Sequence, residues 1–415
     1  MKFKQNIIAA AISAASLGLA SPASATELEV THWWTSGGEA AAVKVFADAF
    51  DAGGDTWKDG AIAGSGGVAR PVIVSRIIGG DPMGATQLNH GRQAEELVEE
   101  GLMLDLTELA EKEGWKDLVR PSSLLDACTL DGKVYCVPVN IHSFQWMWTS
   151  LDAYKKAGID APNDWNEFVA SAPKLREAGI TPLAVGVQPW QTNGMFGVIR
   201  MGLGGIDLYR QIDVDRNAEA MRGPEMAAIW KAFGDARGLD NPNNSTQNWN
   251  DATSQVINAT HGAQIMGDWA QGEFQVAGQT AGTEYDCLPG LGIQPALDTG
   301  GDAFYFPNQD DPEKTAAQLR MASMMMSKPV QVDFNLKKGS LPVRGDVDLA
   351  AANACMKKGL AILEDPANIV PGGDQTWSPD TSGQVEDLLV EFWTDTNMSP
   401  EDAHDKWATI LEEAD

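Results

Sequence analysis

The sequence predicts an α/β fold with mainly parallel sheets, because strand-like and helix-like segments alternate along the whole chain. Residues 27–34, ELEVTHWW, form a short run rich in β-branched and aromatic residues, which is typical of a strand. A turn follows, and from Ala42 to Phe50 apolar residues recur at helical spacing. This alternation is typical of proteins in which helices cover a largely parallel sheet.

The first helix carries its own start and stop signals, and the same rhythm then repeats. Ser36 and Glu39 have the spacing of a capping box, and the pair Gly53-Gly54 ends the helix. Further segments of the same kind are helix-like at 68–80, strand-like at 85–89 and helix-like at 92–101, with later ones at 181–187, 263–274 and 385–393.

Three extended stretches marked by proline predict that the chain passes between two lobes. They lie at residues 135–140, 285–290 and 339–344. If each is a crossing, both lobes are discontinuous in sequence and are joined by short hinges. The expected first lobe comprises residues 26–136 and 288–338, and the expected second lobe comprises residues 137–287 and 339–415.

The first 25 residues read as a cleaved signal peptide. They combine a basic start, an apolar stretch and the ending Ala23-Ser24-Ala25. The apolar stretch is too short and too rich in serine for a bilayer span, and no later segment offers roughly 18 consecutive apolar residues. We therefore expect an exported, soluble mature chain.

The charge of the chain argues against two classes of partner. Its formal net charge is −28, and removal of Lys2 and Lys4 with the signal peptide makes it two units more negative, −30. Such an acidic surface repels nucleic-acid phosphates and anionic lipids. We expect no nucleic-acid partner and no membrane-surface role.

Four cysteines in an exported chain favour disulfides over a metal site. Cys128 and Cys136 flank a segment in which Asp131-Gly132 resembles a hairpin turn, which would bring their sulfurs together. That pairing leaves Cys287 with Cys355, although four cysteines allow three connectivities.

Tryptophan is the most informative residue type. The chain has 14 Trp but only 5 Tyr, and indole faces combined with a few fixed polar groups suit ligand sites, sugar sites in particular. Trp33 and Trp34 sit where a strand meets a helix, and neighbouring strand residues point to opposite faces. We expect one indole in a crevice and the other in the core. Three other stretches fit a site, at 140–148, 187–193 and 266–274, while more than half of all the tryptophans should be core residues.

Individual polar residues have both structural and functional interpretations. Glu39 can cap its own helix, bind ligand hydroxyls, or do both. His90 and His142 lie near amide side chains, yet either is more often a structural histidine than a ligand contact.

Motifs of catalysis and metal binding are weak in this chain. It has no GxSxG, no P-loop spacing, no HExxH and no paired histidines, and the segment 213–217 lacks the rest of a calcium loop. We expect no cofactor and no metal. The enzymatic alternative is a glycoside hydrolase, because Asp268 and Glu273 flank Trp269.

Several motifs together resemble the solute-binding proteins of ABC sugar transporters, with the glucose and galactose binding group as the nearest match. They are HWWTSGGE, YCVPVNIHSFQWMW, GVQPWQ, MGDWAQGEF and GSLPVR, which occur in the expected order across nearly the whole mature chain. The resemblance implies a two-lobed periplasmic binding protein fold with the ligand in the cleft between discontinuous, hinged lobes. It also implies that the protein is not an enzyme, works as a monomer, and delivers its sugar to the transmembrane subunits of a permease.

The resemblance also implies which residues contact the sugar, with Trp269 as the main stacking platform. By motif these are Trp33, Trp34, Glu39, Gln87 and His90 (or Asn89 in its place) from the first lobe, Asn140, His142, Trp190, Asp268 and Trp269 from the second, and the hydroxyl-binding residues Asp302 and Lys338.

One departure from the family concerns the end of the chain. Relatives often carry a histidine where this sequence reads IVPGGDQTW, and Asp374, Gln375 or Trp377 could replace it. The resulting hypothesis is a periplasmic monosaccharide-binding protein for glucose, or next for galactose or mannose. A small oligosaccharide and a secreted glycoside hydrolase are the alternatives.

Overall fold

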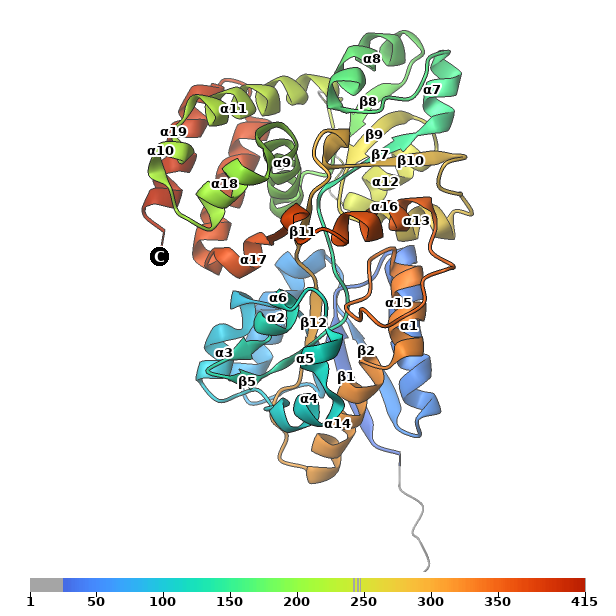
Figure 1. The fold of residues 1–415 in the computed structure, drawn as a ribbon, viewed down its shortest axis with the longest axis vertical. Coiled ribbons are helices and arrows are strands. Elements are labelled where there is room, and N and C mark those ends of the chain that lie inside the picture. Colours follow the sequence, from blue (N-terminus) through green and yellow to red (C-terminus); the bar gives the residue numbers. More distant parts are fainter. Residues whose placement is uncertain (1–24, 242, 245, 247, 415) are drawn as a thin grey trace, which may run out of the picture.

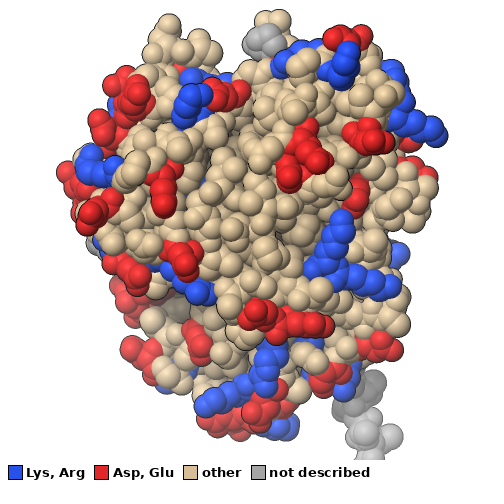
Figure 2. Space-filling view, turned by 45° about the horizontal axis from the view of Figure 1, so that its top comes forward, with Lys and Arg blue, Asp and Glu red and all other residues tan. Residues whose placement is uncertain are grey.

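The computed structural model describes residues 25–241, 243, 244, 246 and 248–414, so nearly all of the expected signal peptide lies outside it. The chain forms two lobes, one above the other in Figure 1, with β11 and α17 at the level between them. Within the described residues, no helix is long and apolar enough to cross a bilayer. Acidic side chains are spread over the face shown in Figure 2, with basic ones interspersed.

The first lobe is built on a five-stranded sheet of order β2-β1-β3-β12-β6. β1 runs parallel to β2 and β3, whereas β12 runs antiparallel to β3 and β6. Its strands are β1 Glu27–His32, β2 Thr56–Ala61, β3 Ala85–Asn89, β12 Asp302–Tyr305 and β6 Cys136–Pro138, with a separate hairpin of β4 Thr129–Leu130 and β5 Lys133–Val134. Its helices are α1 Gly37–Ala52, α2 Ser65–Ile78, α3 Glu95–Glu99, α4 Thr107–Glu113, α5 Trp115–Leu118, α6 Ser123–Asp126, α14 Pro312–Met325 and α15 Lys328–Lys338, with the 3₁₀ turn η1 Arg92–Ala94.

The second lobe is built on a four-stranded sheet of order β10-β7-β9-β8 and carries most of the remaining helices. Its strands are β10 Tyr285–Pro289, β7 Trp146–Ser150, β9 His261–Ile265 and β8 Thr181–Ala184, and β11 Leu297–Thr299 pairs with β13 Ile369–Pro371. Its helices are α7 Leu151–Ala157, α8 Trp165–Glu177, α9 Pro189–Asp213, α10 Ala218–Met221, α11 Pro224–Ala236, α12 Trp249–Ile257, α13 Ala270–Val276, α16 Ala354–Leu363, α17 Gly373–Thr376, α18 Pro379–Thr394 and α19 Pro400–Glu412, with 3₁₀ turns η2 Arg237–Leu239, η3 Gly290–Gly292 and η4 Pro366–Asn368.

The α/β class is confirmed, but the expectation of mainly parallel sheets is wrong. β7 pairs antiparallel with both β9 and β10, and β12 pairs antiparallel with both of its neighbours. β7 and β12 are the first strands that the chain forms after it enters each lobe from the other. A strand reached in that way is not the product of a right-handed strand–helix–strand crossover, so nothing requires it to be parallel.

The expected lobe boundaries also need correction. Leu288 and Pro289 pair in the second sheet, with Met147 and Trp146, although the prediction placed them in the first lobe. Pro138 pairs with Ala303 in the first sheet, although the prediction placed it in the second lobe. Proline has no N–H for a ladder and therefore tends to mark the end or edge of a strand, as Pro138 does for β6 and Pro289 does for β10.

The crossing segments themselves lie side by side. Ile141 and Leu341 exchange two backbone hydrogen bonds, and the N–H of His142 donates to the carbonyl of Gly300. The backbone of Arg344 still pairs with that of Val119 in the first lobe. The last crossing therefore comes between Arg344 and α16 rather than at residue 339. The hinge region is thus a narrow bundle of extended chain.

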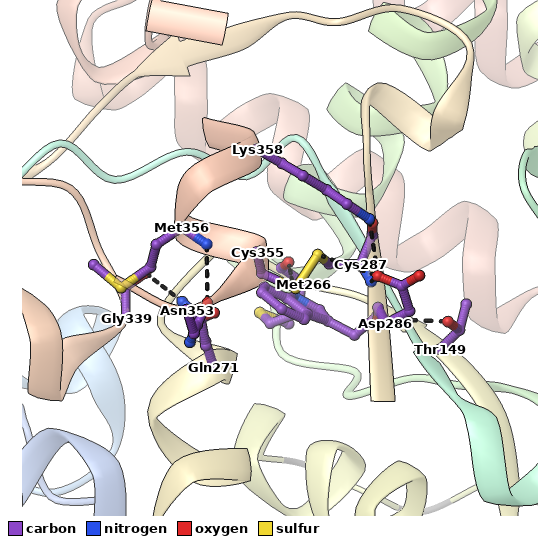
Figure 3. The surroundings of a disulfide bond; sticks show 11 residues. Thr149, Met266, Gln271, Asp286, Cys287, Gly339, Asn353, Cys355, Met356 and Lys358 are labelled. Carbon is purple, nitrogen blue, oxygen red and sulfur yellow. Dashed lines mark hydrogen bonds and ion pairs between the residues drawn. A yellow bond between two sulfur atoms is a disulfide. The ribbon is translucent and has the colours of Figure 1, made fainter. Parts of the chain in front are cut away.

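Both disulfides form with the expected connectivity. Cys128 and Cys136, whose Cα atoms are 5.1 Å apart, close the hairpin of β4 and β5, and its turn has positive φ at Asp131 and Gly132. Cys287 of β10 is bonded to Cys355 of α16, as Figure 3 shows. The second bond ties the helix that follows the last crossing to the second sheet.

Candidate ligand-binding site

A cavity of about 1180 Å³ lies between the two lobes. On the first lobe, Trp33 follows β1, Asn89 ends β3 and Asp302 begins the antiparallel strand β12, and all three line the cavity. The carboxyl ends of parallel strands meet at one edge of a sheet, and an antiparallel neighbour begins there. The sheet of the first lobe therefore directs its polar strand ends into the cleft.

Three tryptophans form the exposed aromatic surface of this cavity. Of the 14 tryptophans, ten are buried, which confirms that more than half are core residues. Trp33, Trp57, Trp190 and Trp269 are half-buried, and all of these except Trp57 line the cavity. Phe144 contacts two of them, with ring centroids 6.0 Å from Trp190 and 4.8 Å from Trp269.

The side chains of Trp33 and Trp34 point to opposite sides, as expected for neighbouring residues of an extended segment. Trp34 is 1% exposed, and its ring contacts Phe304 and Phe334 in the core, with centroids 5.7 and 5.4 Å away. The ring of Trp33 is half-buried against the cavity, where the guanidinium of Arg70 lies 5.9 Å from its centroid. One indole thus anchors the strand end and the other is available to a ligand.

Glu39 takes part both in the cap of its own helix and in an ion pair at the cavity. One carboxylate oxygen accepts from the backbone N–H of Ser36 at 3.4 Å while Ser36 Oγ accepts from the N–H of Glu39, which completes the capping box of α1, and the same oxygen also accepts from the hydroxyl of Ser36 at 3.1 Å. The other oxygen accepts from the Nζ of Lys338 at 3.0 Å, at the end of α15. Both residues are buried and line the cavity. The helix cap therefore holds a desolvated ion pair at the cleft.

Gly38, in the GGE segment beside this cap, is explained by a close approach between the lobes. A Cβ at Gly38 would lie 2.6 Å from the backbone carbon of Gly272 in α13. The N–H of Gly38 also donates to the carboxylate of Glu273 at 2.7 Å. Neither Asp268 nor Glu273 lines the cavity. The two carboxylates proposed for a glycoside hydrolase therefore do not face a common substrate space.

His142 connects two buried aspartates, Asp302 at the cavity surface and Asp268 behind it. Its Nδ1 lies 2.5 Å from Asp268 Oδ1 and its Nε2 lies 2.8 Å from Asp302 Oδ2. Burial by itself would lower the pKa of His142, but these two carboxylates outweigh it and raise the pKa to about 9. The imidazole is consequently protonated at neutral pH, and it neutralises part of the carboxylate charge.

Asp302 is held from three sides. The amide of Gln87 donates to Oδ1 at 2.6 Å, and the amide of Asn140 donates to Oδ2 at 2.9 Å. Although burial opposes ionisation, His142, Lys338 and Asn140 together lower the pKa of Asp302. The orientation of this carboxylate is thus set before any ligand arrives.

The residues expected at the ligand fall into two groups. Eight of them are among the residues that line the cavity, namely Trp33, Trp34, Glu39, His142, Trp190, Trp269, Asp302 and Lys338, although Trp34 is only 1% exposed and its ring packs in the core. The other four, Gln87, His90, Asn140 and Asp268, lie behind this surface, each at most 4% exposed. Gln87, Asn140 and Asp268 are placed to orient cavity residues rather than to line the cavity.

The choice between Asn89 and His90 follows from strand alternation. Asn89 lines the cavity and donates to Asp374 at 2.5 Å, whereas His90 is 1% exposed and does not line the cavity. Burial lowers the pKa of His90 to about 4, so its ring is neutral. Nδ1 of that ring accepts from the amide of Gln375 at 3.2 Å. Of the three candidates for the missing family histidine, Asp374 and Trp377 line the cavity and Gln375 does not.

Several charged residues of the cavity wall were not predicted from the sequence. Arg70 on α2, Arg200 on α9 and Glu386 on α18 line the cavity. Burial raises the pKa of Glu386 to about 7, against the opposing charge of Arg70. In the sequence, each lies within a helical pattern where a charged residue normally indicates a solvent-facing position. No local signal separates these three from other charged helix residues.

The chain is similar in sequence to a known protein family and to proteins of two bacteria. Residues 34–319 match the family model described as bacterial extracellular solute-binding protein. A probable sugar-binding periplasmic protein of Rhizobium meliloti is 38% identical over 86% of this chain and 85% of its own length. A protein of the same description from Brucella melitensis is 37% identical over 84% and 83%.

Solved structures with a similar fold differ in what they bind. A chitin oligosaccharide binding protein matches with a TM-score of 0.77 and 18% identity over 94% of this chain and 99% of its own. The solute receptor AcbH, whose description states an exclusive preference for β-D-galactopyranose, matches with the same TM-score and 15% identity over 94% and 98%. The fold is therefore shared by receptors of one sugar unit and of several.

Proposed function

The chain belongs to the bacterial extracellular solute-binding protein family, and we propose that it is the periplasmic sugar receptor of an ABC importer. The ligand is a sugar whose hexose unit lies in the cleft, with glucose first, then galactose or mannose. The closed, loaded form delivers the sugar to the transmembrane subunits of the permease. The probable sugar-binding proteins of Rhizobium meliloti and Brucella melitensis support this assignment.

One observation carries the proposal: half-buried indoles share a cavity with oriented, buried charges. Trp33, Trp190 and Trp269 supply apolar faces for the C–H side of a sugar ring. Glu39 with Lys338, and Asp302 with His142, supply charged donors and acceptors for hydroxyls. An apolar wall with a few convergent polar groups is the general plan of a small-ligand site.

Specificity between epimers is assigned to the polar groups rather than to the indoles. An indole face contacts any pyranose with a similar apolar patch, so stacking discriminates poorly. A wrong hydroxyl configuration would leave a buried partner such as Asp302 unpaired, at a cost of about 1–3 kcal/mol. That cost corresponds to roughly five- to 150-fold in affinity.

Closure couples binding to transport in this proposal. The cavity is lined from both lobes, and the crossing segments at Ile141 and Leu341 lie side by side where the lobes meet. A ligand that contacts both lobes stabilises the closed form by its difference in affinity for the two forms. The permease can then distinguish loaded from empty receptor.

The test is calorimetric titration of refolded, ligand-free mature protein with monosaccharides that include glucose, galactose and mannose, with disaccharides, and with amino acids and polyols, while tryptophan fluorescence is recorded in parallel. We expect one-to-one binding of one hexose with a fluorescence change. If no saccharide of any size binds, whereas amino acids or polyols do, the proposal is wrong. Turnover of chromogenic glycosides would instead support the hydrolase alternative.

A further inference from the structure

Asp298 lines the cavity, although no motif of the sequence points to it. It is the central residue of the short strand β11, which lies at the level between the lobes in Figure 1, and it pairs with Val370 of β13. Its side chain is half-buried. Because the strand is paired, its backbone is held in place, and the direction of the Asp298 side chain depends on the groups around it.

One oxygen of this carboxyl group is fixed by two donors. The hydroxyl of Ser143 donates to Asp298 Oδ1 at 2.6 Å, and the backbone N–H of Phe144 donates to the same oxygen at 2.9 Å. The ring of Phe144 packs so closely on α9 that a Cβ at Gly194 would overlap it. The carboxyl group is therefore oriented by a segment that is itself packed in place.

The other oxygen, Oδ2, is open to the cavity. It accepts no hydrogen bond from the described part of the chain, and it is not one of the buried polar atoms that are sealed from solvent without a partner. Burial raises the pKa of Asp298 to about 6, and the negative charge of Asp268 adds to the rise. At pH 7.5 the group is thus an ionised carboxylate with one accessible oxygen that has no donor.

Asp298 lies beside the aromatic surface of the cavity. Phe144, whose N–H it accepts, contacts the rings of Trp190 and Trp269. A sugar ring that stacks on an indole covers the aromatic face with its C–H groups and directs its hydroxyls outward, past the edge of that face. The position of Asp298 next to Phe144 therefore suits a hydroxyl at the edge of a stacked ring.

We propose that Asp298 is a specificity-determining residue of the sugar site, and that its Oδ2 accepts a hydrogen bond from one hydroxyl of the sugar ring stacked on the indoles. This inference rests on the proposed sugar-binding function and adds a contact to that site. An ionised carboxylate only accepts, so the ligand has to bring a donor to this point. A hydroxyl does so, whereas a hydrogen atom in its place does not.

The experiment compares the full mature protein with Asp298→Asn by calorimetry at pH 7.5. The probes are the best-bound sugar and its monodeoxy analogues, one for each hydroxyl. Asp298→Asn keeps an oxygen for Ser143 and Phe144 but replaces Oδ2 with an NH₂ group. It should weaken binding of the sugar at least about tenfold, as expected for loss of a hydrogen bond to a charged group.

The analogues identify the hydroxyl that Asp298 contacts. In the unmodified protein, one monodeoxy analogue should bind at least about tenfold more weakly than the sugar. For this analogue alone, Asp298→Asn should cause less than about a twofold further loss, because the contact is already absent. Such coupling between a residue and a ligand group is what a double-mutant cycle measures.

The stability of the ligand-free protein distinguishes a ligand contact from a structural role. The pKa of Asp298 is about 6 in the folded protein, above its ordinary value of about 3.9 in the unfolded chain. Its ionisation at pH 7.5 therefore lowers the stability of the fold. Asp298→Asn removes this cost and should melt at the same or a higher temperature. A residue that only supports the fold would lose stability when it is replaced.

Two further variants serve as control and as substitute. Asp240 is also a buried carboxyl whose pKa burial raises to about 6, but it does not line the cavity, so Asp240→Asn should leave sugar affinity unchanged. If Asp298→Asn does not fold, Ser143→Ala decides the question. It removes the hydroxyl that orients Asp298 and should weaken sugar binding about two- to fivefold.

The outcomes separate the inference from the function beneath it. If Asp298→Asn, or Ser143→Ala in its place, binds the sugar as tightly as the unmodified protein does, the inference is wrong and the sugar receptor stands. The same conclusion holds if Asp298→Asn weakens the sugar and every monodeoxy analogue by one common factor, since no hydroxyl then depends on Asp298. If no saccharide binds to the unmodified protein, the proposed function and the inference both fail.

Discussion

Two parts of the cavity wall are both buried and polar, yet they differ in how their groups are satisfied. We call them the floor, which comprises Glu39, Lys338, His142 and Asp302, and the second-lobe recess, which comprises Gln145, Arg200, Tyr209, Asp213 and Trp377. In the floor, each charge has a partner: Glu39 with Lys338, and Asp302 with His142. In the recess, Arg200 Nε and Gln145 Oε1 have none among the described residues. The difference teaches that burial alone does not decide whether a polar group is satisfied, because the charges of the floor have partners from both lobes and these two atoms of the recess have none.

Removal of His142 should produce the largest effect, because it breaks the most highly charged part of the floor. His142→Leu leaves Asp268 and Asp302 buried without their cation, and loss of one member of a buried ion pair costs about 3–5 kcal/mol. Urea denaturation of the ligand-free protein measures this cost. His404→Leu is the matched control, since His404 is also buried but bonds to the carbonyl of Met221, and it should cost about 1 kcal/mol. Equal losses in the two variants would show that the floor is not held by its charges.

The pH dependence of stability should show the same charge array in the unmodified protein. The pKa of His142 is about 9 in the folded state, above its ordinary value of about 6.5 in the unfolded chain. Its stabilising contribution is therefore complete below pH 6.5 and is lost as the pH rises through about 9. Urea midpoints from pH 6 to pH 10 should fall in the unmodified protein. In His142→Leu this part of the fall should be absent, and parallel curves for both proteins would refute the assignment.

Trp269→Ala tests the aromatic side of the floor and should affect binding rather than folding. Loss of a large apolar face costs about 1.5–3 kcal/mol, or roughly tenfold to more than 100-fold in hexose affinity. Trp57→Ala is the control, because Trp57 is half-buried but lies outside the cavity lining. Calorimetric titration should show a loss for Trp269 only. Unchanged affinity in Trp269→Ala would assign that indole to packing alone.

Ser36→Ala should give the smallest effect and tests whether the helix cap positions Glu39. Loss of an N-cap side chain costs about 1 kcal/mol of stability. Ser399→Ala removes the equivalent cap of α19, far along the chain, and should cost a similar amount. Only Ser36→Ala should also weaken hexose binding, by a few fold, because the hydroxyl of Ser36 donates to Glu39. If both variants bind equally well, the cap and the binding site are independent.

Several features could be predicted because their causes lie within a few residues of one another. The capping box joins Ser36 to Glu39, the hairpin turn at Asp131 brings Cys128 to Cys136, and strand alternation separates Trp33 from Trp34. Helical and strand periodicity likewise predicts the α/β class. Each of these signals acts over less than ten residues of chain, so it can be read in order along the sequence.

The remaining features depend on contacts between distant segments. The direction of β7 and β12 depends on where the chain crosses between lobes, which is why mainly parallel sheets were a wrong expectation. Glu39 meets Lys338 across 299 positions. His142 meets Asp268 across 126 positions. The cavity-lining roles of Arg70, Arg200 and Glu386 have no local signal at all.

The sequence by itself therefore determined the α/β class of this protein, the cap of its first helix, the hairpin turn that joins Cys128 to Cys136, and the opposite placement of Trp33 and Trp34. Only the tertiary structure decided which polar groups are satisfied and which are not. The physical reason is that a helix, cap or turn is stabilised by neighbours along the chain. Desolvation of Asp302, His142 or Arg200, in contrast, depends on segments that meet only when the two lobes have formed.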